Sequence, residues 1–261
     1  TISVAQTNFN QLTVDNTAPN ITNVSAVSGE EGADAASQPL QDINNSMIGD
    51  TVTLTILANE TLKNIAAAAA TPTNPANSIT IRSGGAAITD TPTISYSTNL
   101  VTDDTITLTY VVNAGDTDGA LDYDIDLYDR AGNVTQLTNQ ATTMVVDKTP
   151  PTIVGLDISS NRPLIIDPAR TNAYDHSEHG DIVSVRVVYS EPVRKPDITL
   201  YPNDPTQNSI SMDVTGNGDT WVGSVTMHHS TIAGDIPFEV SKTWDEAGNR
   251  QVQAVVTQND I

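Results

Sequence analysis

Side chains that can bind a hard metal ion recur at matching places in the two halves of this sequence. Each half carries an aspartate beside a proline-containing segment, a glutamate after an alternating apolar segment, and the pattern Asp-x-Ala-Gly-Asn. These residues are Asp15, Glu60, Asp129 and Asn133 in the first half, and Asp147, Glu191, Asp245 and Asn249 in the second. Carboxylate and amide oxygens are the ligands of Ca²⁺, which takes about six to eight of them. The competing interpretation is that Asp-x-Ala-Gly-Asn is only a turn, in which Asp and Asn bond to their own backbone.

The spacing of these motifs identifies an internal repeat. The segment 14–19 (Val-Asp-Asn-Thr-Ala-Pro) recurs as 146–151 (Val-Asp-Lys-Thr-Pro-Pro), 132 residues further on. Gly-Asp-Thr-Val at 49–52 recurs as Gly-Asp-Ile-Val at 180–183, and the Asp-x-Ala-Gly-Asn pattern recurs after 116 residues. Three motifs in the same order indicate two homologous modules that differ in loop length. The predicted division is a lead-in over residues 1–13, one module over 14–146 and a second over 147–261.

The composition excludes several classes of partner. The 261 residues carry a formal net charge of −21, with only 11 Lys and Arg. Nucleic acid and anionic membrane surfaces are bound through basic residues, so neither is an expected partner. The absence of cysteine excludes disulfides and thiolate metal sites. No apolar run approaches the roughly 20 residues that span a bilayer, and no signal peptide is visible, so we expect a mature protein or an excised fragment.

Short alternating segments predict strands throughout both modules. The clearest is 51–57, where Val, Leu and Ile alternate with Thr, as in a half-buried strand. The expected strands are 21–27, 51–57, 78–82, 91–97, 105–112, 121–128 and 142–146, then 153–158, 182–189, 197–201, 209–214, 221–227, 238–244 and 251–257. Seven short strands per module predict an all-β chain of two antiparallel sandwiches. An alanine run at 66–70 predicts one helical turn in a loop, and the lead-in is left open as a frayed extension, the last strand of a preceding module, or a donated strand.

The chain resembles the Ig-like repeats of large bacterial and archaeal cell-surface proteins. The matching residues are Val-Asp-x-Thr-x-Pro at the hinge, Gly-Asp-x-Val before the second strand, Glu after it, and Asp-x-Ala-Gly-Asn after the sixth. Both copies carry all four motifs, so the resemblance covers nearly the whole chain. It implies a secreted, non-enzymatic protein at the cell surface that acts as an adhesin spacer or as a subunit of an S-layer or fibre. Its expected partners are copies of itself or neighbouring Ig-like modules.

An Ig-like topology predicts where the candidate ligands meet. In this topology, two loops lie at the end of the sandwich where the first strand begins. One joins the second and third strands, and the other joins the sixth and seventh. Asp147 should therefore meet Glu191 and the Asp245/Asn249 turn, and from the first module it should meet Asp116 and Asp118. Asp15, Glu60, Asp129 and Asn133 should form half of such a site at the first hinge. The expected cofactor is Ca²⁺, which would fix the angle between modules.

Other polar clusters have less specific interpretations. Asp122, Asp124 and Asp126 share one face of a predicted strand and indicate a solvated face, or else a stripe of cations. His176 and His179, and the pair His228-His229, lack the three or four fixed ligands that zinc requires. Asn-x-Ser/Thr sequons at Asn20, Asn23, Asn44, Asn59 and Asn133 could carry glycans or could occur by chance.

No pattern indicates catalysis. The sequence has no Gly-x-Ser-x-Gly elbow and no glycine-rich phosphate loop before a helix. Aromatic residues make up 4% of the chain, which is little for a platform that stacks sugars. The prediction is a calcium-stiffened structural module. The alternative is a module that binds a surface glycan or protein ligand, with the alanine-rich insertion as the place to look.

Overall fold

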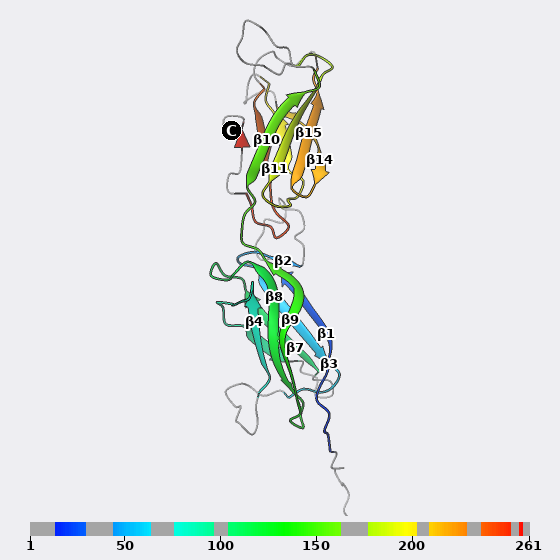
Figure 1. Cartoon of the computed structure of the whole chain (residues 1–261), viewed down its shortest axis with the longest axis vertical. Coiled ribbons are helices and arrows are strands. Elements are labelled where there is room, and N and C mark those ends of the chain that lie inside the picture. Colours follow the sequence, from blue (N-terminus) through cyan, green and yellow to red (C-terminus); the bar gives the residue numbers. More distant parts are fainter. Residues whose placement is uncertain are drawn as a thin grey trace, which may run out of the picture. The chain divides into compact units, whose positions relative to one another are not determined.

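A computed structural model describes residues 14–29, 44–63, 76–96, 104–162, 177–202, 209–228, 236–251 and 256–257. These residues contain strands and no helix (Figure 1). None of them forms a helix long and apolar enough to cross a bilayer. The chain divides into two compact units, one of Thr1–Gly29 with Gly49–Val146 and one of Glu30–Ile48 with Asp147–Ile261. The lead-in over 1–13 and the alanine run at 66–70 lie outside the described residues.

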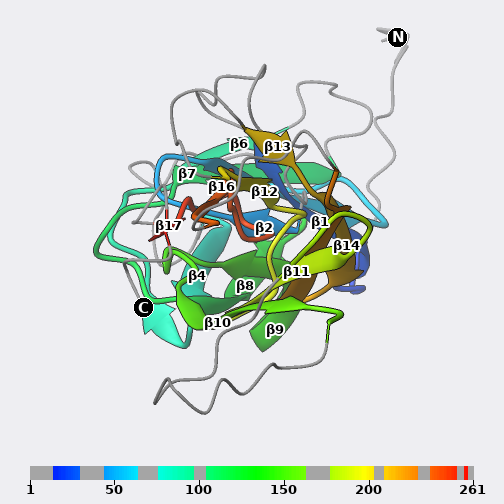
Figure 2. The same cartoon turned by 90° about the horizontal axis from the view of Figure 1, so that it is seen from above.

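The first unit contains two antiparallel sheets. One has the order β1-β3-β7-β6, formed by Ile21–Gly29, Thr51–Ala58, Thr105–Val111 and Thr93–Tyr96. Among the residues of this unit, the other sheet has the order β9-β8-β4-β5, formed by Val134–Val146, Gly119–Tyr128, Ser78–Ser83 and Ala86–Ala87. In Figure 2, β4, β8 and β9 lie side by side in one layer, with β6 and β7 in the other. This strand order is that of an Ig-like sandwich.

The second unit repeats the arrangement. One sheet has the order β10-β11-β15-β14, formed by Ile153–Ser160, Ile182–Tyr189, Thr220–Thr226 and Asp213–Asn217. The other has the order β13-β12-β16-β17, formed by Ile210–Ser211, Asp197–Leu200, Phe238–Ser241 and Val256–Thr257. The predicted fold class, an all-β chain of two Ig-like sandwiches, is confirmed by these sheets.

The core of each unit lies between its two sheets. In β3, Val52, Leu54 and Ile56 are fully buried, and the threonines between them are half-buried. They pack in one cluster with Ile125 and Leu127 of β8, which belongs to the facing sheet. Burial of alternate apolar side chains is the main favourable contribution to such a sandwich, and it explains why the period of two in the sequence locates the strands.

Two strands differ most from the sequence prediction. The segment 209–214, expected to be one strand, is split, because the chain passes from β13 in one sheet to β14 in the other. Met212 lies at the change of sheet, is 6% exposed and packs in the core, so its side chain fills the space between the layers. The last strand of the first unit, expected over 142–146, starts at Val134, because β9 follows the preceding turn directly and pairs with β8 along its length.

Candidate metal centres

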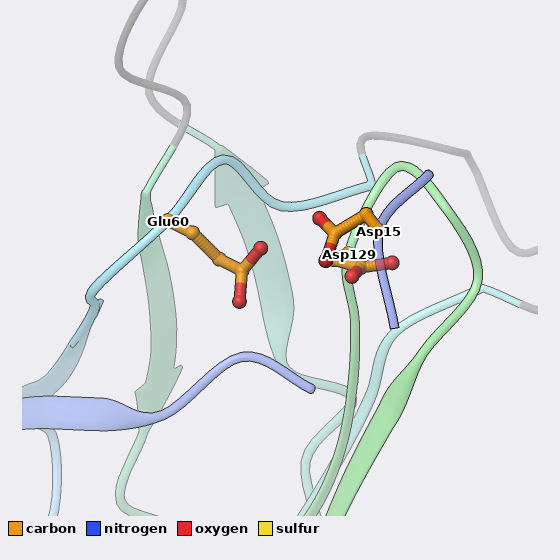
Figure 3. Close-up of side chains that lie close together, drawn as sticks. All are labelled: Asp15, Glu60 and Asp129. Atoms are coloured by element: carbon orange, nitrogen blue, oxygen red, sulfur yellow. The ribbon is translucent and has the colours of Figure 1, made fainter. Parts of the chain in front are cut away.

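Each unit brings together three carboxylates at one end of its sandwich. The first triad is Asp15, Glu60 and Asp129, which come from three separate segments of the chain (Figure 3). The second triad is Asp147, Glu191 and Asp245. Within each triad, one carboxylate oxygen from every residue lies within 4.8 Å of the others. All six residues are among the ligands predicted from the sequence.

The turn after the sixth strand holds one member of the first triad. The Asp129 side chain is 1% exposed. Its Oδ1 accepts hydrogen bonds from the N–H groups of Gly132, at 2.6 Å, and Asn133, at 2.8 Å, and its Oδ2 accepts one from Asn133 Nδ2 at 2.8 Å. Gly132 has a φ of 96°, which favours glycine. The sequence pattern Asp-x-Ala-Gly-Asn is therefore a turn, and this turn fixes the carboxylate in place.

The second unit builds the same turn. Oδ1 of Asp245 accepts from the N–H groups of Gly248, at 2.7 Å, and Asn249, at 2.8 Å, and Oδ2 accepts from Asn249 Nδ2 at 2.8 Å. Gly248 has a φ of 97°, and Asp245 is 1% exposed. Two turns that are separated by 116 residues in the sequence thus agree in every hydrogen bond of the aspartate side chain.

The asparagine of each turn also holds the hinge aspartate. Asn133 Nδ2 donates to the backbone oxygen of Asp15 at 3.2 Å, and Asn249 Nδ2 donates to that of Asp147 at 2.9 Å. The hinge aspartates in turn accept a hydrogen bond from the backbone two residues on, at 3.0 Å in both copies. The sequence predicted an oxygen ligand at Asn133 and Asn249, and this stays a prediction. The contact that the structure shows is made by the amide nitrogen, which positions the hinge aspartate beside the turn.

A backbone contact that the sequence analysis missed places the glutamates. The N–H of Asn59 donates to Asn20 O at 2.9 Å, and the N–H of Asn20 donates to Asn59 Oδ1 at 2.8 Å. In the second unit Ser190 and Thr152 exchange the equivalent bonds, at 2.8 and 3.0 Å. Each pair joins the residue before the triad glutamate to the start of the first strand. The sequence feature that could have indicated this contact is a polar residue directly before each glutamate, Asn59 in the first unit and Ser190 in the second.

The electrostatics of the triads favour a bound positive charge. Burial raises the pKa of Glu60, and the charges of Asp129 and Asp15 raise it further. Burial likewise raises the pKa of Asp245, with a contribution from Asp147, although hydrogen bonds from Asn249 and Gly248 oppose the rise. Three crowded acids disfavour their own ionised forms, and a divalent cation would remove that repulsion.

Asp116 and Asp118 have other surroundings. Asp116 is 3% exposed, and its Oδ1 accepts from Thr89 N–H at 2.8 Å and Thr89 Oγ1 at 2.9 Å. Its Oδ2 accepts from the N–H of Asn113 at 2.9 Å. Asp118 is exposed in the same loop. Within the described ranges, neither residue belongs to a group of three potential ligands. Asp116 therefore joins its own loop to the segment around Thr89, and the joint ligation with Asp147 stays a prediction.

The acidic face of β8 has a partner that the sequence analysis did not identify. Arg82 on the neighbouring β4 contacts Asp122 at 2.6 Å and Asp124 at 2.5 Å. The Arg82 hydrogen bond lowers the pKa of Asp124 to about 2, helped by the N–H of Asn139. Asp126 accepts from Gln136 Nε2 at 2.8 Å. The face is a network of cross-strand pairs, which explains the acids without a stripe of cations.

The histidines do not form a recognisable metal site in the part of the chain that is described. His176 and His229 lie outside that part. The rings of His179 and His228, from two different loops, lie 6.5 Å apart between centroids. No group of three potential ligands among the described residues includes either histidine, so nothing in them meets the requirement of zinc for three or four ligands.

Comparisons with known proteins add little to this description. No family model matches the chain, and no curated protein matches it. Among solved structures, the chain is similar to an I-band fragment of titin, at 10% identity and a TM-score of 0.28, over 87% of this chain and 94% of that chain. A three-Ig structure of an E-to-A variant of titin matches at 10% identity and a TM-score of 0.25, over 82% and 92%. The fold assignment therefore depends on the strand order within the chain itself.

Proposed function

We propose that this protein is a structural, non-enzymatic module of a cell surface, in which Ca²⁺ stiffens the hinge ahead of each Ig-like sandwich. The observation that supports the proposal is the repetition of a carboxylate triad in the same local geometry at both hinges. A turn alone needs the aspartate and asparagine of the turn, but it does not need a hinge aspartate and a glutamate at the same point.

The chemistry of the triads fits calcium better than other metals. Each triad offers only carboxylate oxygens, and the hard oxygen ligands of Ca²⁺ contrast with the imidazole and thiolate ligands common at zinc sites. Three carboxylates supply up to six oxygens when each is bidentate, and water completes such spheres in proteins. With a net charge of −21, the chain also attracts divalent cations to its surface.

The effect of a bound ion on the hinge follows from the three segments that carry the triad. Asp147 precedes the first strand of its unit, Glu191 follows the second strand, and Asp245 follows β16. An ion bound to all three would tie the incoming chain to two loops of the sandwich. Such a tie restricts the hinge without a disulfide, which the cysteine-free chain cannot form. A spacer in an adhesin, or a repeating subunit of a surface layer or fibre, needs this resistance to bending.

The experiment uses thermal unfolding and small-angle scattering with calcium and with excess chelator. A site occupied at a hundred times its dissociation constant stabilises the folded state by about 2.7 kcal/mol. Calcium should raise the melting temperature and narrow the distribution of hinge angles. Asp147→Ala should remove the effect on the second unit only, and Asp15→Ala should remove it from the first, so each variant is the control of the other. If calcium changes neither observable in the unaltered chain, the triads do not bind it and the proposal is wrong.

A further inference from the structure

One outer face of the first unit carries no charged residue among those described, although the chain has a net charge of −21. The face belongs to the sheet β1-β3-β7-β6, in which every second residue points away from the core. Its outward positions hold threonine, serine, asparagine, glycine and aliphatic residues. We call it the threonine face, after the residues at its centre, Thr53, Thr55, Thr107 and Thr109.

The strand register arranges these side chains in rows. Two rows of four residues cross the whole sheet: Ser25, Thr55, Thr107 and Ser95 in one, and Val27, Thr53, Thr109 and Thr93 in the other. Val27 and Val111, at the margin of the face, are 40% and 39% exposed. Methyl and hydroxyl groups therefore alternate with one another over a continuous surface, and no carboxylate interrupts its centre.

The corresponding face of the second unit shows that the fold does not require this composition. There Arg186 lies opposite Asp157 on the neighbouring strand, and Asp213 lies opposite Ser224. All three charged residues are exposed. Alignment of the motifs at 49–52 and 180–183 makes Thr55 the counterpart of Arg186. Strand propensity explains the threonines of the first unit, but it does not explain why every outward charge is missing.

The composition of the threonine face is typical of a contact between proteins. The core of such a contact is depleted of charged residues and its rim is polar. Acids do occur at the border of this face, where Asp90 accepts a hydrogen bond from the N–H of Val111 at 3.2 Å and Asp104 accepts one from the Thr105 hydroxyl at 2.9 Å. The outward positions that the structure describes carry no aromatic ring on which a sugar could stack.

We propose that the threonine face binds the threonine face of a second copy of this chain. A hydroxyl group both donates and accepts hydrogen bonds, so an array of hydroxyls is its own complement. A face without charge also needs no oppositely charged partner, and two strongly acidic chains can meet there without opposing their carboxylates. Two such sheets pack face to face about 10 Å apart, in a contact with two-fold symmetry. The proposal rests on the structural role proposed above, but not on calcium.

The size of the face indicates a weak contact. Its strands contain nine, eight, seven and four residues. With strands about 4.8 Å apart and residues about 3.4 Å apart, the face covers roughly 450 Å². Two copies would bury about 900 Å², which is at the low end for specific contacts. A weak contact suits a surface array, in which neighbouring copies are held at high local concentration.

The test measures self-association of the full chain by sedimentation equilibrium, from micromolar to millimolar concentration and in excess chelator. The unaltered chain should form dimers at the upper end of this range. Thr55→Arg should weaken the association by more than about tenfold, because a two-fold contact brings both arginines onto one uncharged surface. Ser25→Arg, at an exposed position of the same row, repeats the test with little risk to folding. The control, Thr215→Arg, adds the same charge at an exposed position on β14 and should leave association unchanged.

Salt provides a second readout. Association through an uncharged face is opposed only by the general repulsion of two acidic chains, and the screening length falls from about 10 Å at 0.1 M salt to about 3 Å at 1 M. Dimers should therefore become more stable as salt is added. A monomer at millimolar concentration, dimers that salt dissociates, or dimers that both arginine variants leave intact would each overturn the proposal. Since chelator is present throughout, these results are independent of whether the triads bind calcium.

Discussion

Replacing Glu60 with glutamine should change stability in opposite directions with and without calcium. The substitution removes one of three negative charges whose oxygens lie within 4.8 Å of one another. At that separation two unit charges repel by about 0.9 kcal/mol in water and about 3.5 kcal/mol at an effective dielectric of 20. Glu60 is half-buried and Asp15 is exposed, so solvent screening favours the lower value, about 1 kcal/mol for each pair. With chelator, Glu60→Gln should therefore raise the free energy of unfolding by about 1–2 kcal/mol.

Calcium reverses the sign because the same carboxylate becomes a ligand. The unaltered chain gains about 2.7 kcal/mol at a hundred times its dissociation constant. The variant has one anionic ligand fewer, so it binds more weakly and gains less at the same calcium concentration. Thermal unfolding measures both effects, since 1 kcal/mol corresponds to about 4–8 °C in a domain of 60–100 residues. The variant should melt above the unaltered chain with chelator and lose that advantage as calcium is added.

A matched variant distinguishes the effect of removing a charge from the triad from the effect of lowering the net negative charge of the protein. Asp213→Asn removes one charge from an exposed position on β14, outside both triads. It should leave the calcium response unchanged and shift the melting temperature little in chelator. If Glu60→Gln destabilises the chain in chelator and calcium adds nothing to the unaltered chain, the carboxylates neither repel nor bind an ion as argued, and the triad is only part of a turn.

Three further measurements test the turns and the acids. Gly132→Ala should cost about 1–2 kcal/mol of unfolding free energy, since its φ is +96° and an added Cβ meets nothing within 4 Å, so only backbone strain contributes. Equal stability of variant and unaltered chain in urea would contradict this. Asn249→Ala should cost about 2–4 kcal/mol, because it leaves Asp147 O and a carboxylate oxygen of Asp245 without their donor, and Asn249→Asp should not restore it. The pKa values of Asp245 and Glu60 are raised, so the folded state binds protons at these groups more tightly than the unfolded state does. The stability that this tighter binding contributes is fully present below about pH 4, where carboxyl groups ordinarily titrate. It is lost as the pH rises through the raised pKa values. In chelator the melting temperature should accordingly be higher near pH 4 than at pH 7, and calcium should remove the difference; a flat or reversed profile would show that the triads do not control it.

The sequence predicted the fold through local patterns. Alternation of Thr with Val, Leu and Ile over Thr51–Ala58 places a strand because side chains alternate faces with a period of two, and this needs no knowledge of the partner strand. The motif Asp-x-Ala-Gly-Asn identified both turns because their bonds span only three or four residues. The repeat also indicated which acids correspond, and hence the composition of both triads.

Contacts between distant segments were decided by the tertiary structure. Arg82 pairs with Asp122 and Asp124 because β4 lies beside β8 in a fixed register, and the isolated acidic strand gave no sign of it. The division of 209–214 between two sheets depends on the space that Met212 fills in the core. The amide of Asn249 meets Asp147 across 102 residues of sequence. Periodicity and turn chemistry are local, so they fix strands and turns, whereas register and packing decide which side chains face one another.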